Sequence, residues 1–364
     1  MIRLLIADDS ALMRKLLEAI FREEGDFEIE LARNGNEALD LVRSFDPHVV
    51  TLDVQMPGLD GLSCLSRIML EAPRPVVMIS SLTAEGAEAT LQAIELGAVD
   101  FVEKPGRAVS LEIDRLRPLL IEKVRGAARA KIRRTLRLAE RVRHQFQQTG
   151  GTRPAAAPRI KKATVPAGSS NGVVLIGVST GGPAALDIVL PSIPKTFNWP
   201  IVVAQHMPAN FTAAFARRLD TICALDVVEV NRPLPLQAGS IYIARGDADI
   251  VVARRATGLH VMPVPAQREY LWHPSVERMV ASALEHFDPV QIIGVLMTGM
   301  GRDGADAMQQ VHARGGRTMA ESEASAVVWG MPGELVRMGG ATSVRSVEEI
   351  ADGIVEWVGT DAVR

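Results

Sequence analysis

The sequence predicts an α/β protein made of two doubly wound domains, each built around a mostly parallel sheet. Three observations predict this fold class. Short apolar runs alternate with amphipathic stretches over residues 1–122, the same alternation returns over residues 173–364, and a basic stretch rich in glycine, proline and alanine separates them. The 364 residues also exceed what one ordinary hydrophobic core accommodates, so two domains and a linker are expected.

In the first domain, β-type runs alternate with amphipathic helical patterns. The expected strands are residues 3–7, 27–32, 48–54, 75–80 and 98–104, and the expected helices are residues 11–21, 35–45, 60–70 and 84–97. Strands that alternate with helices in this way pair in parallel and are covered on both faces. A parallel sheet with helices on each side is therefore expected for residues 1–122.

Residues 123–172 differ in character from both domains. Between Lys123 and Lys162 the chain has thirteen lysines and arginines and one acid, Glu140. Residues 123–148 predict a basic helix, and residues 149–172 predict a linker. Such a basic stretch raises the alternative of a DNA-binding output, but a DNA reader needs a helix-turn-helix or similar module. We therefore expect a solvated helix and linker, with no nucleic-acid partner.

The second domain, residues 173–364, repeats the strand–helix pattern. The expected strands are residues 173–178, 200–205, 240–244, 249–255, 258–264 and 291–297. The close spacing of three of them predicts an antiparallel edge or hairpin around residues 240–264. The domain is otherwise expected to hold a parallel sheet.

Composition narrows the class of protein further. Hydrophobic residues make up 47% of the chain and charged residues 23%, with a net charge of −3, which is ordinary globular composition. Cys64 and Cys223 stand far apart without metal-site spacing, which fits a reducing compartment. The opening MIRLLIADDS is not a signal peptide, and no apolar run reaches the length of a membrane span. A cytoplasmic protein without membrane insertion is expected.

Carboxylates follow two of the predicted strands in the first domain. Asp8 and Asp9 end the first strand and Asp53 ends the third, so in a doubly wound sheet they share one crevice. Three carboxylates repel one another unless a cation joins them, and Mg²⁺ suits such a cluster. The alternative is that Asp8 or Asp9 merely caps the following helix. Lys104 and Ser80, at neighbouring strand ends, favour the functional interpretation.

These residues carry a resemblance over the whole first domain. The Asp8–Asp9 pair, the DVQMPGLDG segment around Asp53, Ser80, Phe101 and Lys104–Pro105 resemble a response-regulator receiver domain, which has a flavodoxin-like fold. The resemblance implies that a histidine kinase phosphorylates Asp53 and that Lys104 pairs with the phosphoryl group. It also implies that Ser80 and Phe101 form a switch pair. The implied Mg²⁺ ligands are Asp8, Asp9, Asp53 and the Gln55 carbonyl.

In the second domain, the motif G-x-S-x-G occurs as Gly177-Val178-Ser179-Thr180-Gly181. It follows a predicted strand and precedes a predicted helix, which is typical of an exposed serine nucleophile on a sharp turn. Alone the motif is weak, because Ser179 could instead cap the next helix through its hydroxyl. A serine nucleophile also needs a general base.

Two further residues occupy strand ends that could meet Ser179. His206 follows the strand at 200–205, and Asp303 lies in a glycine-rich loop after the strand at 291–297. His206 could be a surface loop residue, and Asp303 could cap its own following helix. The carboxyl ends of parallel strands share one crevice, however, so a Ser179–His206–Asp303 triad is expected there. Among the other histidines, His273 sits in a Trp/Pro turn that could border a pocket.

The second domain also resembles a known family. GVSTGGPAAL, VVAQHMPANFTAAFARRL, GVLMTGMGRDGA and EASAVVWGMPGE are similar to the effector domain of chemotaxis protein-glutamate methylesterases. The resemblance implies that Ser179 is the nucleophile, His206 the base and Asp303 the orienting acid, with Thr180 and Met300 beside the oxyanion and substrate site. EYLWHPSV, at residues 269–276, departs from the usual form of its segment.

The resemblance also implies an activity and its control. The reaction is hydrolysis of glutamate 5-O-methyl esters on chemoreceptor signalling domains, with deamidation of receptor glutamines as a second activity. Methyl-accepting chemoreceptors are then the substrate and a chemotaxis histidine kinase is the phosphodonor. Mg²⁺ serves receiver phosphorylation, whereas ester hydrolysis needs no cofactor. The unphosphorylated receiver is expected to inhibit the catalytic domain.

Overall fold

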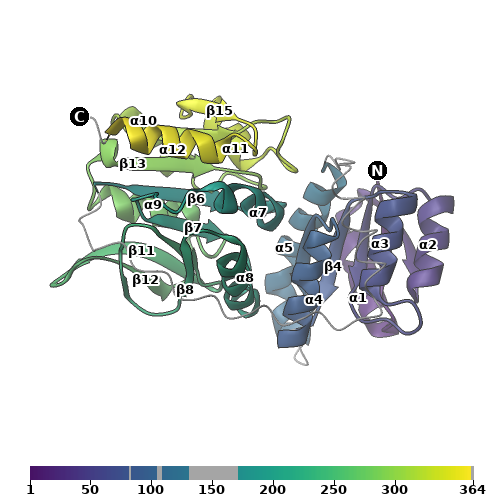
Figure 1. The fold of residues 1–364 in the computed structure, drawn as a ribbon. Helices are drawn as coiled ribbons and strands as arrows, with labels where there is room; N and C mark the ends of the chain where they lie inside the picture. Colours follow the sequence, from purple (N-terminus) through teal and green to yellow (C-terminus); the bar gives the residue numbers. More distant parts are fainter. Residues whose placement is uncertain (82, 105–108, 131–170, 362–364) are drawn as a thin grey trace. The chain divides into compact units, whose positions relative to one another are not determined.

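The chain folds into two units, Met1–Ala167 and Gly168–Arg364, in the computed structural model (Figure 1). The structure describes residues 1–81, 83–104, 109–130 and 171–361. Each unit is an α/β structure with a parallel sheet, as the sequence predicts.

The first unit has a five-stranded parallel sheet in the order β2-β1-β3-β4-β5. Its elements are β1 (Ile2–Ala7), α1 (Ala11–Glu24), β2 (Phe27–Ala32), α2 (Gly35–Ser44), β3 (Val49–Asp53), α3 (Gly61–Glu71), β4 (Val76–Ser80), α4 (Ala84–Glu95), β5 (Asp100–Glu103) and α5 (Val109–Ala128). The chain passes from β1 to β2 on one side and to β3 on the other. The order therefore reverses between β1 and β3, where a crevice forms at the carboxyl ends of the strands.

Local sequence explains where the first helices begin and end. Ser10 is the N-cap of α1, and its hydroxyl accepts a hydrogen bond from Met13 N. Asp8 therefore does not cap this helix, although its Oδ1 accepts the Ser10 N–H at 2.9 Å. Gly25 ends α1 with a φ of 73°, a conformation that glycine adopts without strain. The β3 and β4 strands are buried along their whole length, as expected for the centre of a covered sheet.

Helix α5 continues to Ala128, beyond the predicted domain end at residue 122. Lys123, which the sequence analysis counts as the start of the basic stretch, is 4% exposed, and Val124 and Ala127 are also buried. The Lys123 Nζ lies 2.7 Å from Asp100 Oδ1 and donates to Phe101 O at 2.9 Å. The predicted basic helix beyond residue 130, and nearly all of the predicted linker, lie outside the described residues, so the domain limits stay predictions.

Removing the buried partner of Lys123 is expected to destabilise the receiver unit strongly. Asp100→Ala leaves the ammonium without a carboxylate in the core, which costs about 3–5 kcal/mol in such pairs. Native-state hydrogen exchange of the amides in β4 and β5 of the full chain measures the effect. Arg22→Ala, which removes a surface pair with Glu18, is the control and is expected to cost less than about 1 kcal/mol. Equal effects of the two substitutions would contradict the prediction.

The second unit has a seven-stranded parallel sheet and a separate three-stranded antiparallel sheet. Its first elements are β6 (Val173–Val178), α7 (Gly182–Ser192), β7 (Ile201–Gln205), α8 (Ala209–Ile222), β8 (Asp226–Val230), β9 (Leu234–Pro235), β10 (Ser240–Ala244), β11 (Ala248–Arg255) and β12 (Gly258–Pro265). The remaining elements are α9 (Val276–Leu284), η1 (Pro289–Gln291), β13 (Ile292–Leu296), α10 (Ala305–Ala313), β14 (Arg317–Glu321), α11 (Met331–Arg337), β15 (Ser343–Arg345) and α12 (Ile350–Asp361).

The large sheet has the order β15-β14-β13-β6-β7-β10-β8, and its order reverses between β13 and β6. The β11–β12 hairpin confirms the antiparallel pair expected around residues 240–264. It belongs to its own sheet with β9, however, and β10 pairs in parallel with β7 and β8 within the large sheet. Helix α7 packs on α8 and α12, and helix α10 packs on α9 and α11.

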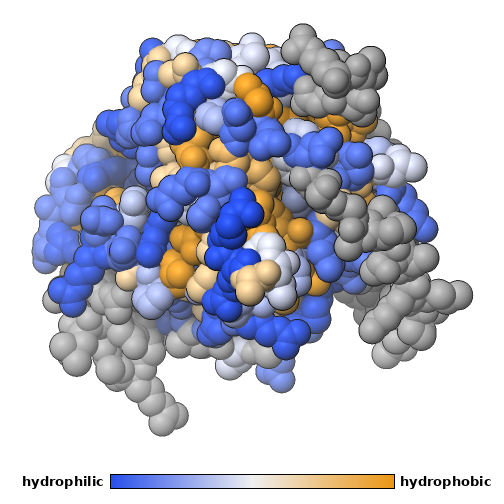
Figure 2. Space-filling view, turned by 90° about the vertical axis from the view of Figure 1, so that its left-hand side faces the viewer, coloured by the Kyte–Doolittle hydropathy of each residue, from blue (hydrophilic) through white to orange (hydrophobic). Residues whose placement is uncertain are grey.

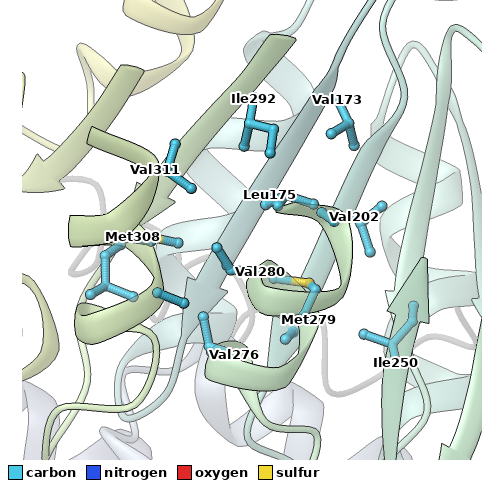
Figure 3. Packing of buried hydrophobic residues seen from close by; sticks show 14 of the residues in the cluster. Val173, Leu175, Val202, Ile250, Val276, Met279, Val280, Ile292, Met308 and Val311 are labelled. Carbon is cyan, nitrogen blue, oxygen red and sulfur yellow. The ribbon is translucent and has the colours of Figure 1, made fainter. Parts of the chain in front are cut away.

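Helix α9 lies between the large sheet and the hairpin, and this packing fixes where it begins. Its residues Val276, Met279 and Val280 are fully buried. Figure 3 shows them facing Leu175 of β6 and Val202 of β7. Ile250 of β11 closes the same cluster from the hairpin side. Burial of side chains of this size stabilises each by about 1.5–3 kcal/mol. The N-terminus of α9 is thereby held at the carboxyl ends of the central strands.

On the side drawn in Figure 2, hydrophilic residues cover most of the surface, and a narrower band of hydrophobic residues runs between them. Within the described part of the chain, no helix has the length and apolar character needed to span a membrane.

Candidate active site and phosphorylation site

Two glycines shape the turn that carries Ser179. A side chain at Gly177 would come within 2.4 Å of Val276, so glycine lets the start of α9 pack against β6. Gly181 has a φ of 78° and is the N-cap of α7, with no side-chain cap. The Ser179 hydroxyl therefore does not cap the next helix. The serine N–H donates to Thr298 O at 2.9 Å, which ties the turn to the end of β13.

His206 and Asp303, 97 residues apart in the sequence, form a buried pair. His206 Nε2 lies 2.8 Å from Asp303 Oδ2, and the histidine is 4% exposed. His206 is thus not a surface loop residue. Its other ring nitrogen, Nδ1, is buried and has no hydrogen-bond partner among the described residues. An imidazole with one nitrogen on a carboxylate and the other unpaired is arranged to accept a proton at Nδ1.

Backbone contacts bring Ser179 beside this pair. The N–H of His206 donates to Val178 O at 3.1 Å. The Gln205 amide donates to Ser179 O at 3.0 Å and to His206 O at 3.1 Å, so one side chain holds both main-chain carbonyls. Within the described residues, the Ser179 hydroxyl makes no hydrogen bond to His206. Catalytic hydrogen bonds of this kind are often formed only once substrate is present.

Asp303 is fixed by a helix other than its own. Its carboxylate accepts the N–H groups of Val276 at 2.7 Å and Glu277 at 3.0 Å, and the Ser275 hydroxyl at 3.1 Å. These groups form the N-terminus of α9, which favours a negative charge. Helix α10, which follows Asp303, has Gly304 as its N-cap instead. Burial alone would raise the pKa of Asp303, but the hydrogen bond and charge of His206 and these N–H groups outweigh it and hold the pKa low.

Glu277 makes the opposite contact: Asp303, just before α10, binds the start of α9, and Glu277 of α9 binds the start of α10. Its carboxylate accepts the Ala307 N–H at 3.1 Å. Burial raises the pKa of the Glu277 carboxyl to about 7, and the charges of Asp303 and Asp306 act in the same direction. Neither Glu277 nor Ser275 is anticipated from the sequence, because both act on a residue far along the chain.

The raised pKa of Glu277 makes the stability of the chain pH-dependent in a defined direction. Between pH 4.5 and about 7, the folded protein holds a proton that the unfolded chain releases. The free energy of unfolding therefore falls as the pH rises through this window. The difference in free energy of unfolding between Glu277→Gln and the native chain is expected to favour the variant more at pH 8 than at pH 5. Urea unfolding at the two pH values measures this difference. Glu285→Gln, at the exposed end of α9, is the control, and an unchanged difference for Glu277→Gln at the two pH values would contradict the prediction.

The two residues expected near the substrate lie on the same loops. Thr180 is 1% exposed, and its carbonyl accepts the Thr298 hydroxyl at 2.8 Å. Met300 is half-buried on the loop between β13 and Asp303. Their roles stay predictions. Trp272, in the turn that the sequence analysis connects with a pocket, stacks on the His206 ring.

In the receiver unit, the predicted acidic residues meet at the reversal between β1 and β3. Carboxylate oxygens of Asp8, Asp9 and Asp53 lie within 4.8 Å of one another. Lys104 Nζ lies 2.6 Å from Asp53 Oδ2 and 3.0 Å from Asp8 Oδ2. The Gln55 N–H donates to Asp53 Oδ1 at 3.1 Å. Burial raises the pKa of Asp53 to about 6 although the Lys104 ammonium opposes this.

The expected switch residues lie next to this cluster. The Ser80 hydroxyl is fully buried and donates to Gly86 O at 3.1 Å, so it is bound to α4 and not to Asp53. Phe101 is 2% exposed, and Lys123 Nζ lies 5.2 Å from the centre of its ring. Ser80 is on β4, which is next to the strand that ends in Asp53. Phe101 is on β5, one strand further away.

Comparisons with known proteins match both units. A family model described as CheB methylesterase matches residues 174–354, and a model described as response regulator receiver domain matches residues 4–113. A protein of Rhodopseudomonas palustris (strain BisB18) is named protein-glutamate methylesterase/protein-glutamine glutaminase 2. It is 65% identical over 364 residues, and the match covers 100% of each chain. A protein of Rhodospirillum rubrum, named protein-glutamate methylesterase/protein-glutamine glutaminase 3, is 54% identical, and the match covers 98% of this chain and 96% of that protein.

A solved structure is similar to about half of the chain. The crystal structure of the Thermotoga maritima CheB methylesterase catalytic domain is 35% identical, covers 51% of this chain and 98% of its own, and has a TM-score of 0.49. The two family models define the class, which is a response-regulator receiver joined to an α/β esterase unit. The chain belongs to the CheB methylesterase family. The family and the enzyme class predicted from the motifs are confirmed.

Proposed function

We propose that this cytoplasmic enzyme hydrolyses glutamate 5-O-methyl esters on the signalling domains of methyl-accepting chemoreceptors, and deamidates receptor glutamines at the same site. One observation carries the proposal. The buried His206–Asp303 pair leaves His206 Nδ1 without a hydrogen-bond partner among the described residues. His206 follows the strand next to the one that Ser179 follows, where the order of the large sheet reverses. The names of the relatives from Rhodopseudomonas palustris and Rhodospirillum rubrum support both activities.

The first half of the reaction forms an acyl-enzyme. Ser179 Oγ attacks the carbonyl carbon of the glutamyl ester, and its proton passes to His206 Nδ1. Asp303 holds the Nε2–H and stabilises the imidazolium that results. The bond from the carbonyl carbon to the methoxy oxygen then breaks, and methanol leaves with the proton from Nδ1. With a glutamine substrate the leaving group is ammonia.

The second half restores the enzyme. Water attacks the acyl carbon, gives its proton to His206 Nδ1, and displaces Ser179 Oγ, which takes that proton back. The developing oxyanion lies at the serine turn, near the positive end of the α7 dipole. Thr180 and Met300 border this position in the proposal.

Receiver phosphorylation controls the enzyme in this proposal. The phosphoryl group moves from a phosphohistidine of a chemotaxis histidine kinase to an Asp53 oxygen, and Lys104 offsets its charge. The three clustered carboxylates fit Mg²⁺, and Asp8, Asp9, Asp53 and the Gln55 carbonyl would hold it. The metal supplies charge neutralisation when bound. Ser80 then leaves Gly86 O for the phosphoryl group, Phe101 follows, and inhibition by the receiver ends.

Release of methanol from receptor membranes tests the substrate. Membranes that carry chemoreceptors with labelled methyl esters are incubated with the full chain, and volatile label is counted over time. Receptors whose methylated glutamates are replaced by alanine are the control. Release that depends on those glutamates supports the proposal, and an absence of release by a folded, phosphorylated chain would overturn it.

A further inference from the structure

Trp272 lies against the ring that the mechanism uses as the base. The centres of the Trp272 and His206 rings are 5.3 Å apart, and their planes differ by 9°. Trp272 belongs to the 269–276 segment, EYLWHPSV, which the sequence analysis marks as unusual and to which the proposed reaction gives no role. The stack makes this segment one wall of the active site.

The imidazole needs a second contact, because its hydrogen bonding alone does not determine the orientation of the ring plane. Nε2 contacts Asp303, whereas Nδ1 has no partner among the residues that the structure describes. One hydrogen bond holds one atom of the ring, and the ring can still tilt about that atom. A flat indole face in near-parallel contact restricts this tilt and adds an attraction that grows when the imidazole becomes charged.

The segment that presents Trp272 is itself anchored by a buried carboxylate. Asp249, at the start of β11, is 1% exposed. Its Oδ1 lies 2.8 Å from His273 Nδ1 and accepts the Ser275 N–H at 2.8 Å, and its Oδ2 pairs with Arg278 at 2.8 Å. The residues directly after Trp272 are therefore fixed to the hairpin. The indole is a held surface and not a free side chain.

We propose that Trp272 is a positioning residue for the hydrolysis, which holds the His206 ring in the plane that directs Nδ1 to Ser179. The proposal rests on the proposed function, because it takes His206 as the base. Trp272 itself need not touch the substrate for this role. A flat ring at residue 272 is then needed for the rate of the chemical step, and much less for substrate binding.

Three variants of the full chain test this role. Trp272→Leu removes the flat face, Trp272→Phe keeps one, and Trp357→Leu makes the same change in α12 as the matched control. For Trp272→Leu, kcat for methanol release is expected to fall by about 10–100-fold, with KM changed by less than about threefold. Trp272→Phe is expected to keep at least about a third of the native kcat, and Trp357→Leu nearly all of it. Trp272→Met replaces Trp272→Leu if the latter does not fold.

A spectroscopic measurement separates positioning from a general structural role. Protons over an indole face are shifted upfield, so the His206 ring protons are expected to resonate upfield in the native chain and to move downfield in Trp272→Leu. An unchanged kcat in Trp272→Leu, or an equal loss in Trp272→Leu and Trp272→Phe, would overturn the proposal. The native chain serves as the test of the proposed function itself, which fails if the folded native chain releases no methanol from receptor membranes. If His206→Gln remains active, His206 is not the base and the role of Trp272 fails with it. Release that is lost in His206→Gln but fully kept in Trp272→Leu contradicts only the role of Trp272.

Discussion

Replacing Ser179 with alanine is expected to reduce kcat/KM for methanol release by about 10⁴-fold or more. The substitution removes one oxygen atom, and with it the only group that can form the acyl-enzyme in the proposed reaction. The turn should persist, because its contacts are made by the main chain. The Ser179 N–H donates to Thr298 O, and the Ser179 carbonyl accepts the Gly182 N–H at 2.8 Å.

Ser192→Ala, at the far end of α7, is the matched control for this loss. Its hydroxyl donates to Ile188 O, so the control also loses a hydrogen bond but lies away from the site. Ser192→Ala is expected to keep native turnover, and both variants are expected to show the same circular dichroism. Deamidation should fall together with ester hydrolysis in Ser179→Ala, because both need the same nucleophile. A Ser179→Ala chain that retains more than a few per cent of either activity would contradict the assignment.

Asp303→Asn is expected to reduce kcat by about 10³–10⁴-fold. The Asp303 carboxylate accepts from Ser275, Val276, Glu277 and His206, which an asparagine with one carbonyl oxygen cannot do. If the amide NH₂ faces His206, it donates to Nε2. The imidazole proton then moves to Nδ1, the nitrogen that has to accept the serine proton.

Asp306→Asn, three residues further along the chain, is the matched control. Its carboxylate pairs with Arg302 on the surface, and the Asp306 side chain is 45% exposed. This variant is expected to keep kcat within about twofold of the native value. Measured side by side on receptor membranes, equal rates for Asp303→Asn and Asp306→Asn would contradict a catalytic role for Asp303.

The sequence predicts the strand ends that carry the chemistry, because parallel strands collect such residues at one edge. Ser179, His206 and Asp303 follow β6, β7 and β13, which are neighbours in the sheet. Asp8 follows β1, and Asp53 is the last residue of β3. Strand-end position predicts that these residues share one sheet edge, and the family resemblance supplies the roles expected of them. The two-domain α/β fold likewise follows from the alternation of strand and helix patterns, which requires no knowledge of contacts between elements.

What could not be predicted depends on contacts between distant segments. Local sequence favours Asp303 as the cap of its own helix, whereas the structure places it on the N-terminus of α9, 26 and 27 residues earlier in the chain. The stacking of Trp272 on His206 likewise depends on how α9 and the hairpin pack. Lys123 reads as part of a charged stretch, and only its pairing with Asp100 accounts for its burial.

Control of the esterase by the receiver is tested by the rate of methanol release with and without a small phosphodonor and Mg²⁺. The measurement compares the native chain with Asp53→Asn on the same receptor membranes, with Asp60→Asn, at the N-cap of α3, as a control for loss of a receiver carboxylate. The phosphodonor is expected to raise the rate for the native chain and for Asp60→Asn, and to leave the rate of Asp53→Asn at its basal value. An equal increase in Asp53→Asn, or no increase in a native chain shown to be phosphorylated, would contradict control of the esterase by the receiver.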